Sequence, residues 1–277
     1  MCAPGTLAGW RAKLLGVLTL ESGDARVVVA PEKGGRIVAL NVGGLDLLVT
    51  PEVDDHNFGC FPMAPWAGRI RHGSFEFEGQ RYQLPLNNPP HAIHGTARDH
   101  PWHEDGDGVI SAALEPPWPF GGRVVQRFAL APDALHLTME VHADDRPMPA
   151  SCGWHPWWSR RAGRGDALTV DLDAGAMYER DEAGMPTGKL VDLGPHPWDD
   201  CFTRLGDRPA VLRWPGAITV TLETSCSCVV VFDEPEHAIC VEPQTGPPDA
   251  FNLGPTVVRP GEPLVATATW SWQLEDG

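Results

Sequence analysis

The sequence predicts an all-β protein whose strands form a large antiparallel β-sandwich. Three observations support this prediction: apolar and polar residues alternate in many short segments, turn residues separate these segments, and we find no convincing helix of ordinary length. The 277 residues include 30 glycines and 28 prolines, which favour turns over helices. Sandwiches of this size often fold as one unit. We therefore expect a single domain over residues 1–277, with residues 1–19 as a poorly defined N-terminal extension.

The expected strands follow one another along the chain. Continuous apolar runs indicate strands covered on both faces at residues 27–30 and 229–232. Alternation of apolar and polar residues indicates half-buried strands at residues 75–78, 134–141, 168–172, 218–222 and 266–274. Turn residues separate them at residues 33–35, 42–44, 78–80, 131–133 and 260–261. We also place Cys226 and Cys228 on one face of a strand.

Composition excludes several classes of function. Acidic residues outnumber basic ones by 37 to 21, and the formal net charge of −16 disfavours binding to nucleic acid or to anionic membranes. No stretch is apolar for long enough to span a bilayer. The seven cysteines form no C-x-x-C motif, which indicates reduced, mostly buried thiols in a cytoplasmic protein. The apolar run at residues 14–20 lacks a small-residue cleavage site, so a secretory signal is disfavoured.

Glu242 is the first candidate for chemistry. It ends an alternating segment, because Pro243 follows it and opens a loop rich in proline and glycine. A carboxylate at such a strand end can be lifted from solvent and used as a base. From this segment alone, an exposed glutamate at a turn is the alternative.

His155 is the second candidate, and it lies among tryptophans in the segment SCGWHPWWSR. An imidazole exchanges protons near neutral pH, and the faces of indole rings such as Trp157 could stack on a sugar. The alternative is a core histidine packed among core tryptophans.

Three further clusters carry polar side chains. His91 and His94 have H-x-x-H spacing but no partner acid at a set distance, so a hydrogen-bonding histidine fits better than a metal ligand. Arg69 precedes a predicted hairpin, and its guanidinium suits neighbouring hydroxyls, although an ordinary surface arginine would fit as well. Asp199 and Asp200 must face opposite sides if the chain is extended, so only one can point into a given pocket.

Six segments, taken in chain order, resemble landmarks of the aldose 1-epimerase, or galactose mutarotase-like, family. The family's opening strands resemble PEKGGRIVAL, and its Asn-Arg-Ile-x-x-Gly-x-Phe motif resembles AGRIRHGSFEFEGQRYQLPLN. Its Leu-His-Gly, Thr-His-x-Tyr-Phe and Asp-His-x-Phe motifs resemble AIHG, GWHPWW and DDCF. Its Leu-Glu-x-Gln-x-x-Pro-Asp-Ala-x-Asn motif resembles VEPQTGPPDAFN. The resemblance covers residues 20–274, and six matches in order are more specific than any one.

The resemblance implies a fold and a set of site residues. The fold is the family's galactose mutarotase-like supersandwich, in agreement with the alternation of apolar and polar residues. The implied catalytic residues are Glu242 as general base, His155 as general acid and His94 as a second active-site histidine. The implied sugar-binding residues are Arg69, Asp199, Trp157 and Gln244.

The resemblance also implies a reaction. The base takes the proton of the anomeric hydroxyl while the charged histidine donates to the ring oxygen, so the ring opens, rotates about C1–C2 and closes on the other face. The carboxylate and the imidazolium are expected to face each other across the sugar, with mutual attraction favouring both charges. No metal or organic cofactor is needed. The partner is a small-molecule sugar, and the protein is expected to act as a monomer or homodimer.

The sequence departs from the family's motifs, because Gly68 stands where the family has asparagine and Asp200 where it often has histidine. It therefore does not predict which aldose is preferred. A glucose-6-phosphate 1-epimerase-like hexose-phosphate mutarotase is one alternative. The basic residues that could hold its phosphate are Arg71, Arg98, Arg160 and Arg161. A glycosidase using Asp199 and Glu242, and a non-catalytic carbohydrate-binding protein, are the others.

Overall fold

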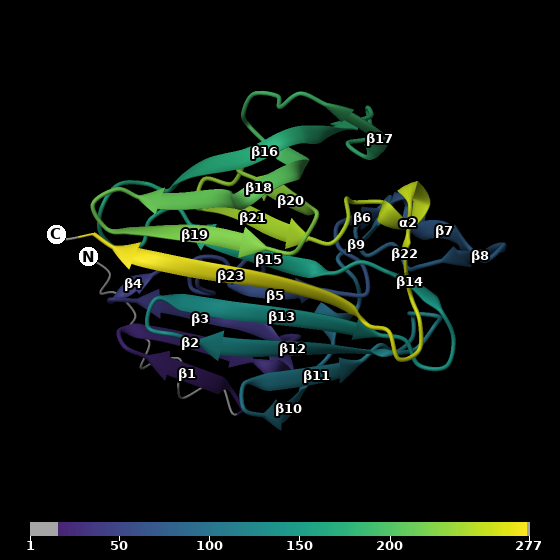
Figure 1. Cartoon of the computed structure of the whole chain (residues 1–277), viewed down its shortest axis with the longest axis horizontal. Coiled ribbons are helices and arrows are strands. Elements are labelled where there is room, and N and C mark those ends of the chain that lie inside the picture. Colours follow the sequence, from purple (N-terminus) through teal and green to yellow (C-terminus); the bar gives the residue numbers. More distant parts are fainter. Residues whose placement is uncertain (1–15, 276–277) are drawn as a thin grey trace.

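The computed structural model describes residues 16–275, and its regular structure is almost entirely β-strand (Figure 1). Within this range, seventeen strands join in one sheet whose ladders are all antiparallel, so the predicted all-β antiparallel architecture is confirmed. The expected N-terminal extension falls largely outside the described residues, and Leu18 and Thr19 already belong to the first strand. Among residues 16–275, no helix is long and apolar enough to cross a membrane.

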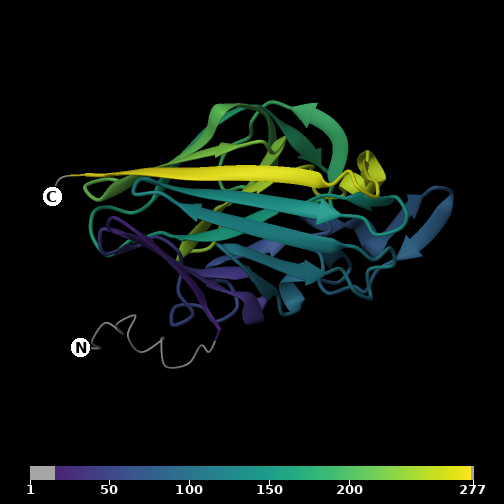
Figure 2. The same ribbon diagram turned by 60° about the horizontal axis from the view of Figure 1, so that its bottom comes forward.

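The sheet folds over on itself into two layers (Figures 1 and 2). In hydrogen-bonded order, one layer contains β10 (His103–Gly106), β11 (Val109–Ala113), β12 (Arg123–Leu130), β13 (Ala134–His142), β23 (Leu264–Leu274) and β19 (Ile218–Thr224). The other contains β20 (Cys228–Phe232), β21 (Ala238–Gln244), β15 (Gly153–Ser159), β5 (Cys60–Met63), β3 (Arg36–Val42), β2 (Ala25–Ala30) and β1 (Leu18–Ser22).

The long strand β18 (Asp199–Trp214) belongs to both layers. Its first residues pair with β20 and its last residues pair with β19. Between these halves, Arg204 has a positive φ of 55° and the ladder with β16 (Thr169–Arg180) shifts register. The local irregularity therefore lies where the strand passes from one layer to the other.

The remaining strands and helical turns are short. β17 (Pro186–Val191) pairs with β16 in a hairpin at the top of Figure 1, and β4 (Leu45–Asp46) pairs with β3. Three two-stranded ribbons complete the strands: β6 (Arg69–Ile70) with β9 (Ala92–Ile93), β7 (Ser74–Phe77) with β8 (Gln80–Gln83), and β14 (Met148–Ala150) with β22 (Thr256–Val258). The helical turns are η1 (Pro31–Lys33), η2 (Arg71–Gly73), η3 (Ala97–Asp99) and α2 (Ala250–Leu253).

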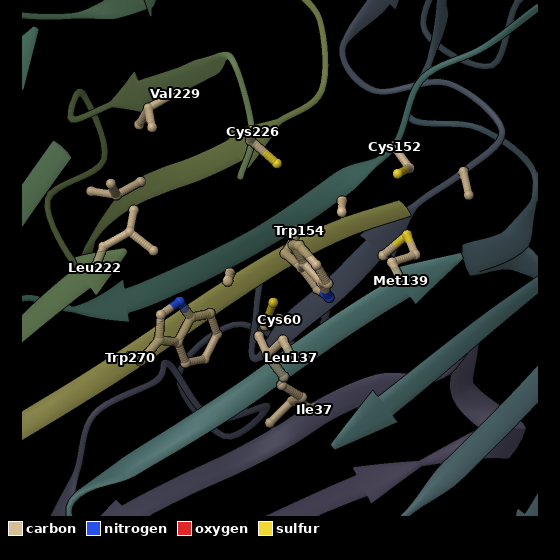
Figure 3. Packing of buried hydrophobic residues seen from close by; sticks show 14 of the residues in the cluster. Ile37, Cys60, Leu137, Met139, Cys152, Trp154, Leu222, Cys226, Val229 and Trp270 are labelled. Carbon is tan, nitrogen blue, oxygen red and sulfur yellow. The ribbon is translucent and has the colours of Figure 1, made fainter. Parts of the chain in front are cut away.

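The main core lies between the two layers. Figure 3 shows Leu137 and Met139 of β13 packing with Trp154 of β15 and Trp270 of β23. The rings of Trp158 and Trp270 meet across the layers, with centroids 4.8 Å apart. The alternation in β13, β19 and β23 therefore corresponds to one face in this core and one face turned away from it.

One local prediction is wrong. Cys226 and Cys228 do not share a strand face, because β20 begins only at Cys228. Cys226 lies in the preceding turn and packs in the main core, whereas Cys228 packs in a small cluster with Cys201 and Val230. A change of direction between β19 and β20 separates the two cysteines, and alternation inside a strand does not extend through such a turn.

Candidate active site

The site lies on the face of β5, β15, β20 and β21 that points away from the main core. Alternation along β15 sends Trp154 and Trp158 into the core and His155 and Trp157 to the opposite face. In the β15–β21 ladder, Gly153 pairs with Gln244 and Trp157 with Cys240. His155 therefore lies opposite Glu242, which is halfway between those two pairs.

The two candidate proton-transfer residues are in direct contact. Nε2 of His155 lies 3.2 Å from Oε1 of Glu242. Nε2 of Gln244 donates a hydrogen bond of 3.1 Å to the other oxygen, Oε2. All three side chains are buried, with His155 only 5% and Glu242 only 2% exposed. The sequence led us to expect a sugar's width between the carboxylate and the imidazole, but the structure places them side by side.

Aromatic rings fix the orientation of the His155 imidazole. Phe61 of β5 and Trp157 both stack on it, with ring centroids 4.5 Å and 5.0 Å away. His94 meets the same ring edge-on, with centroids 5.0 Å apart and planes at 88°. Nδ1 of His155 and Nδ1 of His94 are buried and have no hydrogen-bond partner among the described residues. The imidazole is therefore held mainly by ring packing and by its contact with Glu242.

Burial shifts the protonation of these groups. It raises the pKa of Glu242 well above the ordinary value, because a carboxylate loses its hydration there. It lowers the pKa of His155 well below the ordinary value, and the positive charges of Arg98 and Arg36 add to this. Burial also lowers the pKa of His94, with His155 as the next cause. Burial thus opposes both charges, whereas the mutual attraction expected from the sequence would favour them.

The β6–β9 ribbon brings Arg69 and His94 to the same pocket. Arg69 pairs with Ile93, and the amide of His94 donates to the carbonyl of Gly68 over 2.9 Å. Gly68 has a φ of +66°, and a Cβ there would lie 2.8 Å from Cβ of Pro248. A side chain at position 68 would need a strained backbone and movement of Pro248, so the departure from the family's asparagine is built into this loop.

Charged side chains form one wall of the pocket. Oδ2 of Asp199 lies 3.7 Å from Nη1 of Arg69 and 3.6 Å from Nη1 of Arg180. Nε of Arg180 also lies 2.8 Å from Oδ1 of Asp200, and both aspartates line the cavity, so the expectation that only one could reach it is wrong. Burial raises the pKa of Asp199, although the two arginines act in the opposite direction. Arg180 was not predicted from the sequence. It follows Tyr178 by two residues at the end of β16, and both residues line the cavity.

The turn of the β16–β17 hairpin closes another side of the pocket. Gly184, Met185 and Pro186 from this hairpin line the cavity. Asp181 organises the turn by accepting hydrogen bonds from the amides of Ala183 and Met185. A 2.8 Å ion pair between Asp181 and Nη2 of Arg71 joins this hairpin to η2, which follows β6 directly.

The resulting cavity has a volume of about 150 Å³. All seven residues proposed from the sequence line it: Arg69, His94, His155, Trp157, Asp199, Glu242 and Gln244. These residues come from five separate stretches of the chain, so the fold brings the sequence clusters together. Lining residues that the sequence analysis did not propose include Tyr178, Arg180, Cys201, Val230 and Phe232.

The arginines considered for phosphate binding do not line this cavity. Arg71 pairs with Asp181 and Asp249. Arg160 donates to the backbone carbonyls of Asp233 and Pro235. Each is thus already engaged elsewhere in the structure.

The remaining candidates of that group also point elsewhere. The guanidinium of Arg98 lies 4.8 Å from the centroid of Phe61 and pairs with Asp99, and Arg161 is exposed outside the cavity. His91 likewise has a local role, since its Nδ1 accepts a hydrogen bond from the amide of His72. Residues 16–275 contain two groups of side chains close enough to share a metal ion, and neither includes His91 or His94.

Comparison with known proteins identifies the family. Residues 16–270 match the family model described as aldose 1-epimerase, so the chain belongs to the aldose 1-epimerase family of isomerase-type carbohydrate epimerases. The chain is 22% identical to the uncharacterized protein YihR of Escherichia coli (strain K12) over 266 residues, 86% of each chain.

Solved structures bear on the fold. A galactose mutarotase-like protein from Clostridium acetobutylicum superposes with a TM-score of 0.83 at 18% identity, covering 94% of this chain and 95% of that one. A galactose 1-epimerase from Lactobacillus acidophilus NCFM gives a TM-score of 0.80 at 18% identity with the same coverage. The galactose mutarotase-like fold expected from the sequence is therefore confirmed.

Proposed function

We propose that the protein is a mutarotase that interconverts the α- and β-anomers of an aldose, with Glu242 as general base and His155 as general acid. The observation that carries the proposal is the contact of 3.2 Å between Nε2 of His155 and Oε1 of Glu242 at the wall of a cavity. The cavity has a volume of about 150 Å³, which equals the liquid volume of about five water molecules and matches a cavity that holds a six-membered ring such as benzene.

Placing the two groups side by side suits the chemistry of the anomeric centre. The hydroxyl oxygen and the ring oxygen are both bonded to C1, so one edge of the sugar presents both atoms to neighbouring groups. Glu242 removes the hydroxyl proton while His155 donates a proton to the ring oxygen, and the C1–O5 bond breaks. After rotation about C1–C2, the same transfers in reverse close the ring and restore both residues.

The pKa directions strengthen each assigned role. A raised pKa makes the Glu242 carboxylate a stronger base, and a lowered pKa makes the His155 imidazolium a stronger acid. To begin the cycle, the single proton of the pair must lie on His155 and not on Glu242, although burial favours the opposite placement. Closely coupled groups share such a proton as a unit, so their titration belongs to the pair.

Other residues that line the cavity would hold the sugar or position the acid–base pair. Arg69 and Asp199 offer a donor and an acceptor near one another, which suits adjacent hydroxyls. Gln244 orients the Glu242 carboxylate through its hydrogen bond, and Trp157 supports the ring of His155. We assign His94 a place beside His155, where its edge-on packing limits how that imidazole can turn.

Charge balance favours an uncharged aldose over a sugar phosphate. The arginines that line the cavity, Arg69 and Arg180, already face Asp199 or Asp200. A phosphate would have to compete with these carboxylates. We also propose a cytoplasmic location, which is supported by six free, buried cysteines among the described residues.

Polarimetry of freshly dissolved α-anomers tests the proposal. The full-length protein is expected to accelerate the approach to anomeric equilibrium for at least one free aldose in a panel, and to act more weakly on glucose 6-phosphate than on glucose. The activity would be refuted by rates no faster than the spontaneous reaction across the whole panel. A preference for the phosphorylated sugar would instead favour the hexose-phosphate alternative.

A further inference from the structure

A third chemically active side chain lies beside the proposed acid–base pair. Cys240 precedes Glu242 by two residues on β21, so both side chains lie on the same face of the sheet. One ligand atom each from His155, Cys240 and Glu242 lie within 4.8 Å of one another. All three residues are buried, and Cys240 is a free thiol.

The spacing of these atoms fits the coordination of a small divalent cation. Zinc binds nitrogen, oxygen and sulfur at about 2.0 to 2.3 Å, which puts tetrahedral ligand atoms about 3.3 to 3.8 Å apart. The separation of 3.2 Å between Nε2 of His155 and Oε1 of Glu242 is close to the lower end of this range. The other ligand pairs lie within 4.8 Å, so each must shorten by about 1 Å or less to reach the upper end of this range.

The donor set also selects a class of metal. A thiolate with an imidazole and a carboxylate suits zinc and other thiophilic ions, whereas magnesium and calcium prefer oxygen ligands alone. His155 and Glu242 line the cavity, so a fourth position can open towards it. Zinc sites with three protein ligands keep this kind of open position, which water or a sugar hydroxyl can fill.

We propose that His155, Cys240 and Glu242 form a binding site for a thiophilic divalent cation such as Zn²⁺, and that the bound ion blocks sugar isomerisation. Binding breaks the S–H bond of Cys240 and displaces the proton held by the His155–Glu242 pair. Both protons are released to solvent as the sulfur, nitrogen and oxygen atoms bond to the metal, with no change of oxidation state. The ion would occupy the lone pairs that the acid–base pair needs. The inhibition therefore rests on the proposed function, but metal binding itself does not.

Cys240 also has a simpler structural role, which the experiment must separate from metal binding. It packs in an apolar cluster with Phe61, Met63 and Trp157. A thiol behaves there as a small apolar residue. A metal site requires in addition that Cys240 binds the ion through its sulfur.

The experiment measures metal binding directly on the full-length, metal-free protein. Zn²⁺ affinity is determined by competition with a chromophoric chelator, and Co²⁺ is added in parallel because thiolate ligation gives it a charge-transfer absorption band. The variants are Cys240→Ala and Cys240→Ser, and the matched control is Cys226→Ala, since Cys226 is another buried free thiol but lies outside the group. Circular dichroism selects the variants that fold.

We expect one Zn²⁺ per chain and a cobalt–thiolate band in the wild type and in Cys226→Ala. Both Cys240 variants should lose the band and bind Zn²⁺ more weakly by over about 100-fold, since losing even an outer partner of a metal ligand costs about 10- to 100-fold. Zinc should slow mutarotation by the wild type but leave each Cys240 variant at its own zinc-free rate. Magnesium should affect neither.

Several results would overturn the inference. The metal site would be refuted if the wild type did not bind zinc, or if the Cys240 variants bound zinc as tightly as the wild type. Zinc bound through Cys240 by a protein with no activity on any sugar would remove the proposed function and the inhibition, but keep the site. Mutarotase activity in a protein that does not bind zinc would keep the proposed function but remove the metal site.

Discussion

The two faces of β15 and β21 carry opposite kinds of side chain. On the core face, Trp158 and Val241 pack between the layers without charge. On the site face, His155 and Glu242 are buried just as deeply but are polar. Burying such groups costs free energy, whereas burying apolar surface stabilises the fold. One pair of strands thus combines a stabilising face with a costly one, and the core face holds the register that sets the distance on the site face.

The largest expected effect is a loss of activity without a loss of stability when Glu242 or His155 on the site face is replaced. Glu242→Gln and His155→Asn should each lower the rate of mutarotation by about 10² to 10⁴, because each removes one positioned proton transfer. The free energy of unfolding should stay the same or rise at neutral pH, since the buried ionisable group is gone. Polarimetry and urea denaturation measure the two quantities.

Either variant at the wild-type rate would show that the assigned roles are wrong. A folded Glu242→Gln protein that still binds sugar, from a wild type without measurable activity, would favour the non-catalytic alternative. The native fold of both variants should be checked by circular dichroism before rates are compared.

The next largest effect is on the core face. Trp158→Ala should lower the free energy of unfolding by about 3 to 5 kcal/mol, as large-to-small substitutions of aromatic core residues do. Trp158 packs against Trp270 and Trp214, with ring centroids 4.8 Å and 6.2 Å away. Leu190→Ala on β17 is the control, and it should change stability by about 0.5 kcal/mol or less because its side chain is 39% exposed. Equal losses in the two variants would contradict the assignment of the core.

Glu242 and His155 should affect the pH dependence of stability in opposite directions. Between pH 4.5 and its raised pKa, Glu242 holds a proton in the folded state that the unfolded state has released, so stability falls as pH rises. Between its lowered pKa and pH 6.5, His155 lacks a proton that the unfolded state holds, so stability rises with pH. In the wild type the two effects oppose each other between pH 4.5 and 6.5.

Single variants should reveal each effect separately. In Glu242→Gln, where only the His155 effect remains, stability should rise with pH up to 6.5, with a slope of up to about 1.4 kcal/mol per pH unit. His155→Asn should lose stability above pH 4.5 with a similar limiting slope. Urea denaturation at several pH values tests both signs, and a reversed sign in either variant would contradict the assigned shift.

The smallest expected effect concerns Gln244. Gln244→Ala removes the 3.1 Å hydrogen bond to Oε2 of Glu242 and should lower kcat/KM by the equivalent of about 0.5 to 1.5 kcal/mol, roughly tenfold or less. The pH profile of the rate should shift as well, because the amide favours the ionised carboxylate. A rate loss as large as that of Glu242→Gln would place Gln244 in the proton transfer itself.

The sequence predicted the strands better than their contacts. Alternation of apolar and polar residues is local, so β13, β19 and β23 could be predicted from it. β5 lacks such alternation and contains Pro62, so its role beside His155 could not be predicted. Local sequence features made His155 and Glu242 candidates, and the resemblance to a family then implied their roles. Their direct contact depends on the register between strands that are distant in sequence, which local patterns do not contain.

Strand β18 has a consequence for how the molecule responds to a ligand. Its sixteen residues begin at Asp199 in the pocket wall and end at Trp214 in the main core. The place where a substrate would be held and the place where the layers pack are therefore one uninterrupted length of backbone. A ligand that contacts Asp199 would therefore contact the same strand that packs between the two layers.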